Sequence, residues 1–285
     1  MRRQKVLLQA LYKTLLYSDV FDYPLTGEQL FQLVDRKVDA KDFFQTIKQL
    51  PHVISGRTLY YFLPKREKIV LLRQEKEKIS IKKMQIVRKI ASLLSLIPTV
   101  QYIGVSGSLA LMQADKKSDS DLFFITKKNT VWMTRFFVYC FIFFLGKKRG
   151  KKYVEKAICA NMFLDESALQ FPKEKRNLYV AHEIVQLVSL INKNNTYNRF
   201  LLANTWVKKY FPNKKFPKKI KQEKTISFSF LTIPLEFVFR LGQLFYMRQK
   251  KTREVTDASR IAFHPIDYEK IILHEYEKRK RKYGI

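Results

Sequence analysis

Two aspartates separated by one serine, Asp119 and Asp121, stand at the start of an apolar stretch. The run from Leu122 to Ile125 predicts a strand. Because side chains two residues apart on a strand point to the same side, we expect two neighbouring carboxylates. Such a pair repels, which raises one pKa or requires a cation between the two groups. A hard divalent metal ion held by both carboxylates is the simplest explanation.

A glycine–serine pair precedes these aspartates and follows another apolar strand, predicted over Val100–Val105. Gly107 and Ser108 open a short helix that is predicted to run to Gln113. Glycine lets the backbone approach a phosphate, and the first N–H groups of a helix, with a serine hydroxyl, can hold an anion. The two strands would bring this turn and the metal ligands to one end of a sheet. That geometry suits Mg²⁺ placed against a nucleoside triphosphate for an in-line displacement.

This arrangement resembles the nucleotidyltransferase superfamily typified by DNA polymerase beta, over roughly residues 100–165. The resemblance implies a small mixed-sheet core in which Gly107 and Ser108 bind the nucleoside triphosphate. It also implies that Asp119 and Asp121 bind Mg²⁺, with two ions at the site. The structural alternative is an Asp-x-Asp sequence in a surface turn. The whole chain also resembles bacterial and archaeal nucleotidyltransferase-domain proteins with an N-terminal module and a helical tail.

The resemblance to this family also implies a third carboxylate on a later strand, which often acts as the general base. That strand is predicted over 156–164, with Asn161 as its mid-strand polar residue and Asp165 at its far end. Counting by two places Asn161 on one face with Cys159, Phe163 and Asp165. An amide can ligate a metal through its carbonyl but cannot accept a proton at neutral pH. Either Asp165 substitutes, or the substrate is activated otherwise, or the domain binds nucleotide without turnover.

The first 64 residues predict a small module of three helices and a β-hairpin. The signals are helical spacing over 3–17, a capping box at Thr26–Gln29, a helix over 39–50 and a turn at 55–58. This is the order of a winged helix, whose third helix can enter a major groove. Lys48 on that helix and Arg57 on the hairpin are the candidate nucleic-acid contacts. Packing or protein contact is the alternative use of such a module.

The rest of the chain divides into a charged helical connector (65–96), the nucleotidyltransferase core (97–166) and a helical C-terminal domain (167–285) that closes the cleft. The predicted fold class is therefore α+β or α/β: a small mixed-sheet core between a winged-helix-like module and a helical domain.

Two apolar segments, 136–145 and 228–247, are the candidates for contact with a membrane. We expect no membrane partner. The first is shorter than the ~20 residues that a span needs, and the second contains Glu236 and Arg240. Both are interpreted as core helices, and the alternative is that the second lies on a membrane surface through its apolar face. A further apolar helix is predicted over 178–191, where His182 and Glu183 are interpreted as structural.

Charge and cysteine content indicate the compartment and the partners. The chain of 285 residues has 55 Lys and Arg against 25 Asp and Glu, a formal net charge of +30. This favours a polyanionic partner, either a nucleic acid (RNA or DNA) or an acidic membrane, although the Lys excess also suits an AT-rich genome. Only Cys140 and Cys159 are present, so we expect a reduced, cytoplasmic protein without a disulfide framework.

Together these patterns predict a Mg²⁺-dependent nucleotidyltransferase, which moves a nucleotidyl group from a nucleoside triphosphate to an acceptor and releases pyrophosphate. The acceptor would be an RNA end, a protein side chain or a small molecule. The alternative is a DNA-binding regulator whose degenerate nucleotidyltransferase core senses a nucleotide.

Overall fold

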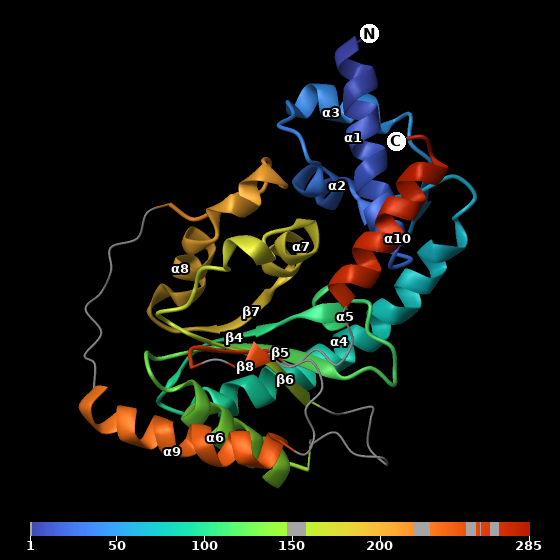
Figure 1. Cartoon of the computed structure of the whole chain (residues 1–285). Helices are drawn as coiled ribbons and strands as arrows, with labels where there is room; N and C mark the ends of the chain where they lie inside the picture. Colours follow the sequence, from blue (N-terminus) through green and yellow to red (C-terminus); the bar gives the residue numbers. More distant parts are fainter. Residues whose placement is uncertain (1, 147–157, 219–228, 249–254, 257, 263–267) are drawn as a thin grey trace.

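A central six-stranded sheet lies between helices on both of its faces, and a group of N-terminal helices stands at one end (Figure 1). The computed structural model describes residues 2–146, 158–218, 229–248, 255–256, 258–262 and 268–285. The molecule is mixed α and β, with a mixed sheet and a largely helical C-terminal region. The predicted fold class is confirmed at that level.

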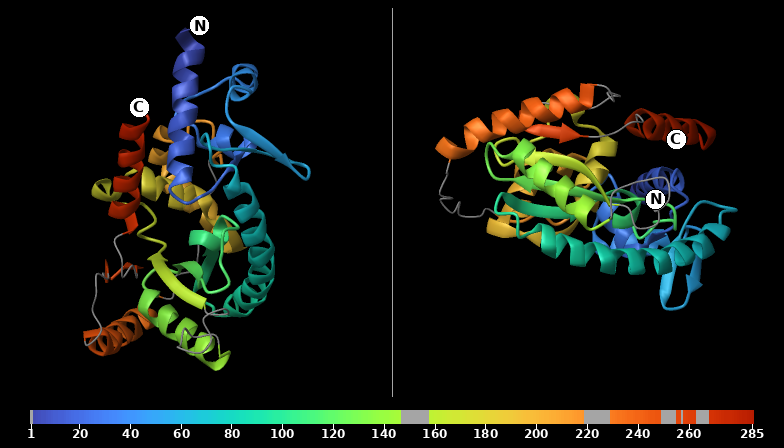
Figure 2. Two further views of the ribbon diagram at one scale, coloured as in Figure 1. Left: turned by 90° about the vertical axis from the view of Figure 1, so that its right-hand side faces the viewer. Right: turned by 90° about the horizontal axis from the view of Figure 1, so that it is seen from below.

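The N-terminal group contains three helices and a small three-stranded sheet of order β1-β3-β2. Its elements are α1 (Arg2–Asp19), β1 (Leu25–Thr26), α2 (Gly27–Leu33), α3 (Ala40–Ile47), β2 (His52–Ser55) and β3 (Thr58–Tyr61). The predicted capping box is confirmed, because Thr26 Oγ1 accepts from Gln29 N and Gln29 Oε1 accepts from Thr26 N. The predicted hairpin is confirmed as well, with Ser55 opposite Thr58. Figure 2 shows this hairpin projecting from the molecule.

Helix α4 (Lys68–Leu94) joins the N-terminal group to the central sheet. At its start, Ile69 and Val70 pack beside Tyr60 and Phe62 of the hairpin segment. Towards its end, an apolar row that includes Val87 belongs to the core beneath the sheet. The connector predicted over 65–96 is thus one helix with a solvated face and a buried face.

The central sheet has the strand order β7-β4-β5-β6-β9-β8. Its strands are β4 (Val100–Val105), β5 (Ser120–Thr126), β6 (Ile158–Asp165), β7 (Val188–Asn192), β8 (Val255–Thr256) and β9 (Arg260–Ala262). β5 and β6 run parallel, and the other neighbours are antiparallel. Side chains on β5 alternate between two cores: Leu122 and Phe124 face α4 and α6 (Val131–Phe144), whereas Phe123 and Ile125 face α7 (Leu178–Gln186) and α8 (Thr196–Ala203).

Two sequence predictions about the C-terminal region are wrong. The helix predicted over 178–191 ends at Gln186, and Val188–Asn192 is strand β7, paired with β4. A continuous apolar run fits a buried helix or a strand equally well, and the open edge of β4 decides between them. Because β7, β8 and β9 supply both edges of the sheet, the region after residue 167 is not a separate helical domain.

Helix α9 (Ser229–Met247) differs from the core helix predicted over 228–247. It lies against the outer side of α6, with most of its apolar side chains exposed. The last helix, α10 (Tyr268–Lys282), returns to the N-terminal group and packs against α1 and α7. Within the residues described, no helix is long and apolar enough to cross a membrane.

Candidate functional site

The backbone of Gly107 lies directly against the carboxylate of Asp121. Gly107 has φ +63°, and a Cβ there would lie 2.8 Å from Asp121 Oδ2. One residue earlier, Ser106 N donates to Asp121 O over 3.0 Å, which joins the end of β4 to the start of β5. The structure therefore brings the glycine–serine turn and the second aspartate together, and a side chain at position 107 would force the Asp121 carboxylate to move.

Ser108 follows in helix α5 (Gly107–Ala110), a single turn. Its carbonyl accepts from Gln113 N over 2.8 Å, which closes the turn. Next to this bond, Met112 adopts φ +57°, a left-handed conformation that few non-glycine residues take. The loop after β4 is thus tightly folded and keeps Ser108 next to the Gly107–Asp121 contact.

The segment that leads to Asp119 is held by helix α4. Ser80 Oγ accepts from Ala114 N over 2.9 Å. The ammonium group of Lys83, whose residue is only 7% exposed, donates to Lys116 O over 3.0 Å and also to Ser118 O. An ammonium group that binds two loop carbonyls fixes the backbone just before Asp119. The connector helix therefore positions the first aspartate.

A carboxylate from helix α7, Glu183, lies near Asp121. Burial, together with the Asp121 carboxylate, raises the pKa of Glu183 to about 7. One helical turn earlier, burial and then Glu183 raise the pKa of Tyr179, with smaller effects from other groups including Asp121. Sequence reasoning interpreted Glu183 as structural, because it stands in an apolar helix. An ionisable residue among apolar neighbours on the buried side of a helix was the available signal.

His182, the neighbour of Glu183, is part of the interior. Its ring stacks on Tyr17 with centroids 3.9 Å apart and meets Phe211 edge-on at 4.6 Å. Burial lowers the pKa of His182 to about 3, so the ring is neutral, and its Nδ1 lies 3.2 Å from the Gln186 amide nitrogen. His182 anchors α7 on α1 and leaves Glu183 beside the aspartate.

The predicted face shared by Asn161, Cys159, Phe163 and Asp165 is wrong, because β6 contains a bulge. Leu122 pairs with Ala160 but Phe123 pairs with Met162, so Asn161 has no partner position on β5. An extra residue reverses the alternation beyond it. Cys159 pairs with Asp121 on the α7 side, whereas Phe163 belongs to the opposite core.

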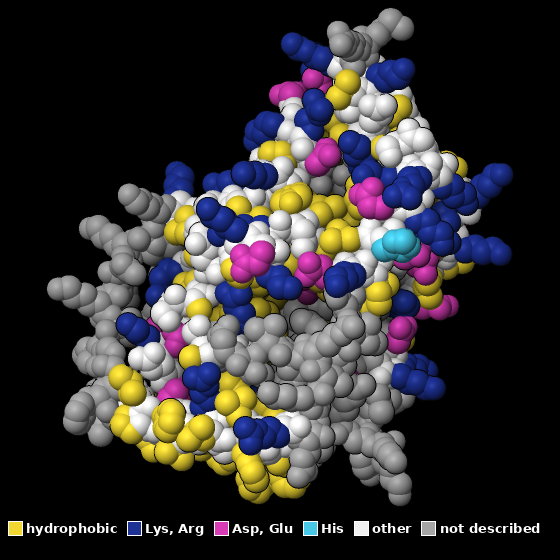
Figure 3. Space-filling model, viewed as in Figure 1, with side chains coloured by type: hydrophobic (Ala, Val, Ile, Leu, Met, Phe, Trp, Pro, Cys, Tyr) yellow, Lys and Arg dark blue, Asp and Glu magenta, His cyan; other side chains and the backbone are white. Residues whose placement is uncertain are grey.

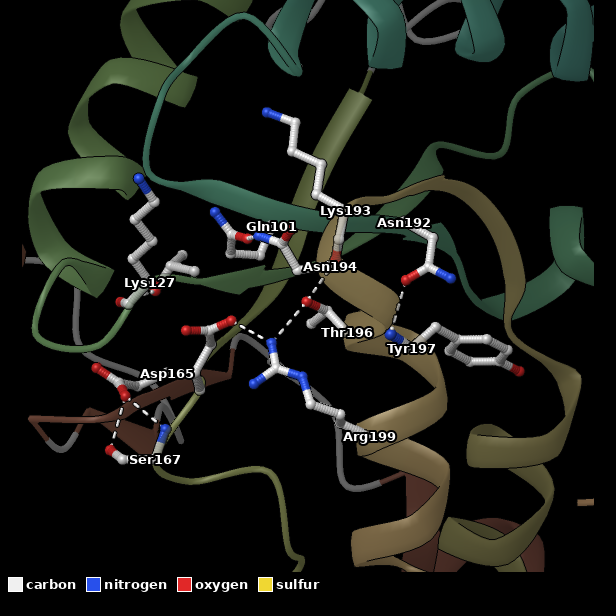
Figure 4. A network of polar contacts seen from close by, with 12 residues as sticks. Gln101, Lys127, Asp165, Ser167, Asn192, Lys193, Asn194, Thr196, Tyr197 and Arg199 are labelled. Carbon is white, nitrogen blue, oxygen red and sulfur yellow. Dashed lines mark hydrogen bonds and ion pairs between the residues drawn. The ribbon is translucent and has the colours of Figure 1, made fainter. Parts of the chain in front are cut away.

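Asp165 is not brought to the aspartate pair. It pairs with Thr126 at the other end of β5, about 16 Å of strand away from Asp121 at ~3.3 Å per residue. Its carboxylate is 1% exposed and accepts from Asn129 N, from Ser167 N at 2.7 Å and from Ser167 Oγ at 2.6 Å (Figure 4). These bonds join the end of β6 to the loop before α6, which is a structural role.

Lys48 and Arg57 lie on the N-terminal group and are both exposed. Lys48 follows the last residue of α3, and Arg57 stands in the turn of the projecting β2–β3 hairpin (Figure 2). They belong to a different part of the molecule from the carboxylates. The structure thus offers two separate polar surfaces, one at the strand ends and one on the N-terminal group.

The donors at the strand ends fit Mg²⁺ by their chemistry. Among the described residues, no group of three or more His, Cys, Asp or Glu side chains has an arrangement that could hold a metal ion. Mg²⁺ is commonly held by one or two carboxylates, with substrate phosphates and waters as further ligands. Asp119 and Asp121, beside the turn at Gly107 and Ser108, are donors of the kind that this mode of binding uses.

Comparisons of this chain with family models, with curated proteins and with solved structures found no match.

Proposed function

We propose that the chain is a Mg²⁺-dependent nucleotidyltransferase, which moves a nucleotidyl group from a nucleoside triphosphate to an acceptor. The observation that carries this proposal is the contact between the Gly107 backbone and the Asp121 carboxylate. It puts a backbone turn able to hold phosphate next to a metal-ligating oxygen, as nucleotidyl transfer requires.

The residues have distinct roles in this proposal. Gly107 and Ser108 hold the triphosphate, and Asp119 and Asp121 bind Mg²⁺, which when bound neutralises charge on the phosphates. Glu183 takes the role of general base, because a carboxyl group with a pKa of about 7 accepts a proton near neutral pH. Glu183 thereby takes the position of third carboxylate for which Asp165 was the candidate, and no role remains for the Asn161 amide.

Label transfer tests this function. The full chain is incubated with each α-labelled nucleoside triphosphate, Mg²⁺ and, separately, total RNA, lysate protein or a metabolite extract. We expect label on one acceptor class and its loss in Asp119→Ala + Asp121→Ala. Asp115→Ala is the matched control, because this aspartate is exposed in the same loop and should leave transfer intact. No transfer to any acceptor would contradict the proposal.

A DNA-binding regulator is the second candidate, and the N-terminal group favours it. The element order there is that of a winged helix, the β2–β3 hairpin projects, and Lys48 and Arg57 are both exposed. A regulator would bind duplex DNA with strong salt dependence, lose affinity in Lys48→Ala + Arg57→Ala, and release no pyrophosphate. Measured duplex affinity and pyrophosphate release, on the same preparation, separate the two functions.

A further inference from the structure

Helix α9 packs against the rest of the protein through a side that combines polar residues with Phe239, Leu244 and Met247 at the main core. The side turned inward carries Glu236, Arg240, Gln243 and Met247, at the spacing of one helix face. Glu236 is 9% exposed, and its carboxylate accepts from Trp132 N at 2.7 Å and from Met133 N at 2.9 Å, at the start of α6. Gln243 bonds Trp132 O at 2.7 Å and also Arg135. Polar bonds to α6, together with apolar packing on the main core, therefore hold α9 in place.

The opposite side of α9 is apolar and exposed, which reverses the usual arrangement of a surface helix. Val238 is 64% exposed and Phe245 is 75% exposed. Phe239 at the edge of α9 meets Phe136 and Phe137 of α6, with ring centroids 4.9 and 5.8 Å apart, and so joins the two helices. We call the exposed set the apolar face: Ile233, Leu235, Phe237, Val238, Leu241 and Phe245 on α9, with Phe136, Phe137 and Phe144 on α6.

The surroundings of the apolar face are basic. Helix α6 contains no Asp or Glu, and the carboxylate of α9, at Glu236, is buried. Figure 3 shows apolar side chains gathered over α9, with Lys and Arg side chains beside them. Arg248 at the end of α9 and Lys128 before α6 are both exposed. An apolar surface of this size with a basic border indicates a contact site.

The net charge of the chain indicates which kind of partner binds the apolar face. Two copies that each carry +30 repel one another, which disfavours self-association through this face. An anionic lipid surface attracts the same charge and accepts Phe, Leu and Ile side chains at the level of the headgroups. We propose that the apolar face docks on an anionic membrane surface, with α6 and α9 lying in the plane of the interface.

The shape of the molecule agrees with docking on a surface rather than insertion across it. The apolar face covers one side of two adjoining helices, and no described helix can span a membrane. In Figures 1 and 2, α9 lies at the opposite end of the molecule from α1–α3. Docking through α9 would leave the N-terminal group and its hairpin turned away from the lipid.

Vesicle sedimentation with the full chain tests the proposal. One set of vesicles is phosphatidylcholine alone, and the other contains one quarter phosphatidylglycerol. We expect binding to the anionic vesicles, and Val238→Glu + Phe245→Glu should lower the apparent affinity at least about tenfold. The matched control is Ile54→Glu + Leu71→Glu, whose residues are 73% and 65% exposed on other elements. It adds the same negative charge and should bind nearly as well as the original chain.

Three outcomes would overturn the proposal. One is that the original chain stays in the supernatant with anionic vesicles. Another is an equal loss in both double variants, which would assign the binding to net charge alone. The third is a dimer or an acidic protein complex that the Val238→Glu + Phe245→Glu variant dissociates while vesicle binding is unchanged. Thermal melts of both variants check that the fold is intact, as exposed positions predict.

Discussion

At the scale of single residues, the site depends on how close the Gly107 backbone and the Asp121 carboxylate come. The alternation of strand residues does not predict this distance. The left-handed φ of Gly107 and its missing side chain allow the close approach. A substitution at position 107 would therefore affect nucleotide binding as well as the stability of the fold. A substituent at position 107 competes for the space in which a phosphate and a metal ligand would meet.

Gly107→Ala should abolish Mg²⁺-nucleotide binding, because its Cβ would lie 2.8 Å from Asp121 Oδ2. Gly56→Ala is the matched control: its φ is +61°, but nothing lies within 4 Å of the added Cβ. Both variants should lose about 1–2 kcal/mol of stability from the left-handed backbone. Melting curves and nucleotide titrations measure the two effects. Equal nucleotide affinity in the two variants would count against the site.

Glu183 should make stability depend on pH. Its pKa of about 7 in the folded chain lies above the ordinary value of 4.5, so the folded state resists ionisation. The resulting loss of stability is zero below pH 4.5, grows as the pH rises to about 7 and stays constant above that. Glu183→Gln should therefore be more stable than the original chain above pH 7, by roughly 1–3 kcal/mol, and equal below pH 4.5.

Urea unfolding across this pH range measures the difference, and Glu75→Gln, at an exposed position on α4, is the control. The same Glu183→Gln preparation should lose transfer activity by about 10²–10⁴-fold if Glu183 is the general base. A stability difference that does not change with pH would show that Glu183 has the same pKa in the folded and the unfolded chain, and would remove it from that role.

At the scale of elements, the site is assembled by helices that belong to different parts of the chain. α4 holds the loop before Asp119 through Ser80 and Lys83, and α7 supplies Glu183. Asp165 does not reach them, because it pairs with Thr126 at the other end of β5 and accepts a hydrogen bond from the loop before α6. The packing of α4 and α7 therefore determines that Asp119 and Glu183, and not Asp165, lie beside Asp121.

Lys83→Met should weaken Mg²⁺-nucleotide binding without melting α4. The substitution keeps much of the side-chain volume but removes the ammonium group that binds Lys116 O and Ser118 O. The loop before Asp119 then loses its anchor, at a cost of about 1.5–3 kcal/mol for a charged hydrogen-bonding group. Lys82→Met, at the exposed neighbouring position, is the control. Calorimetric titration and circular dichroism give the two readouts, and unchanged affinity in Lys83→Met would mean that the loop needs no anchor.

At the scale of the whole molecule, the N-terminal group and the sheet are parts of one packed body. The core of α1–α3 also takes in Tyr276 of α10. Tyr17 of α1 contacts Tyr276 edge-on at 5.5 Å and stacks on His182 of α7. The sequence suggests successive modules, but in the structure the last helix, α10, packs against the first helix, α1.

We therefore expect one cooperative thermal transition for the full chain, with equal calorimetric and van't Hoff enthalpies. Tyr276→Ala should lower the midpoint of that transition and leave it single, since truncating a large buried aromatic costs about 3–5 kcal/mol. Tyr283→Ala, at an exposed tyrosine beyond the end of α10, is the control. Two separate transitions in the original chain would show that the N-terminal group unfolds on its own.

The sequence by itself determined the features that residue type and spacing indicate within a short stretch of chain. These are the capping box at Thr26, the β2–β3 hairpin, strand β4 at its predicted bounds, and the turn at Gly107 before a strand that begins beside Asp119. Only the tertiary structure decided the features that join distant segments: β7 on the open edge of β4, the bulge at Asn161, Glu183 beside Asp121, and the outward apolar side of α9. Hydrophobic periodicity and secondary-structure propensity depend on neighbouring residues alone. Strand pairing, burial and the distance between charges depend on which distant segment packs against a given one.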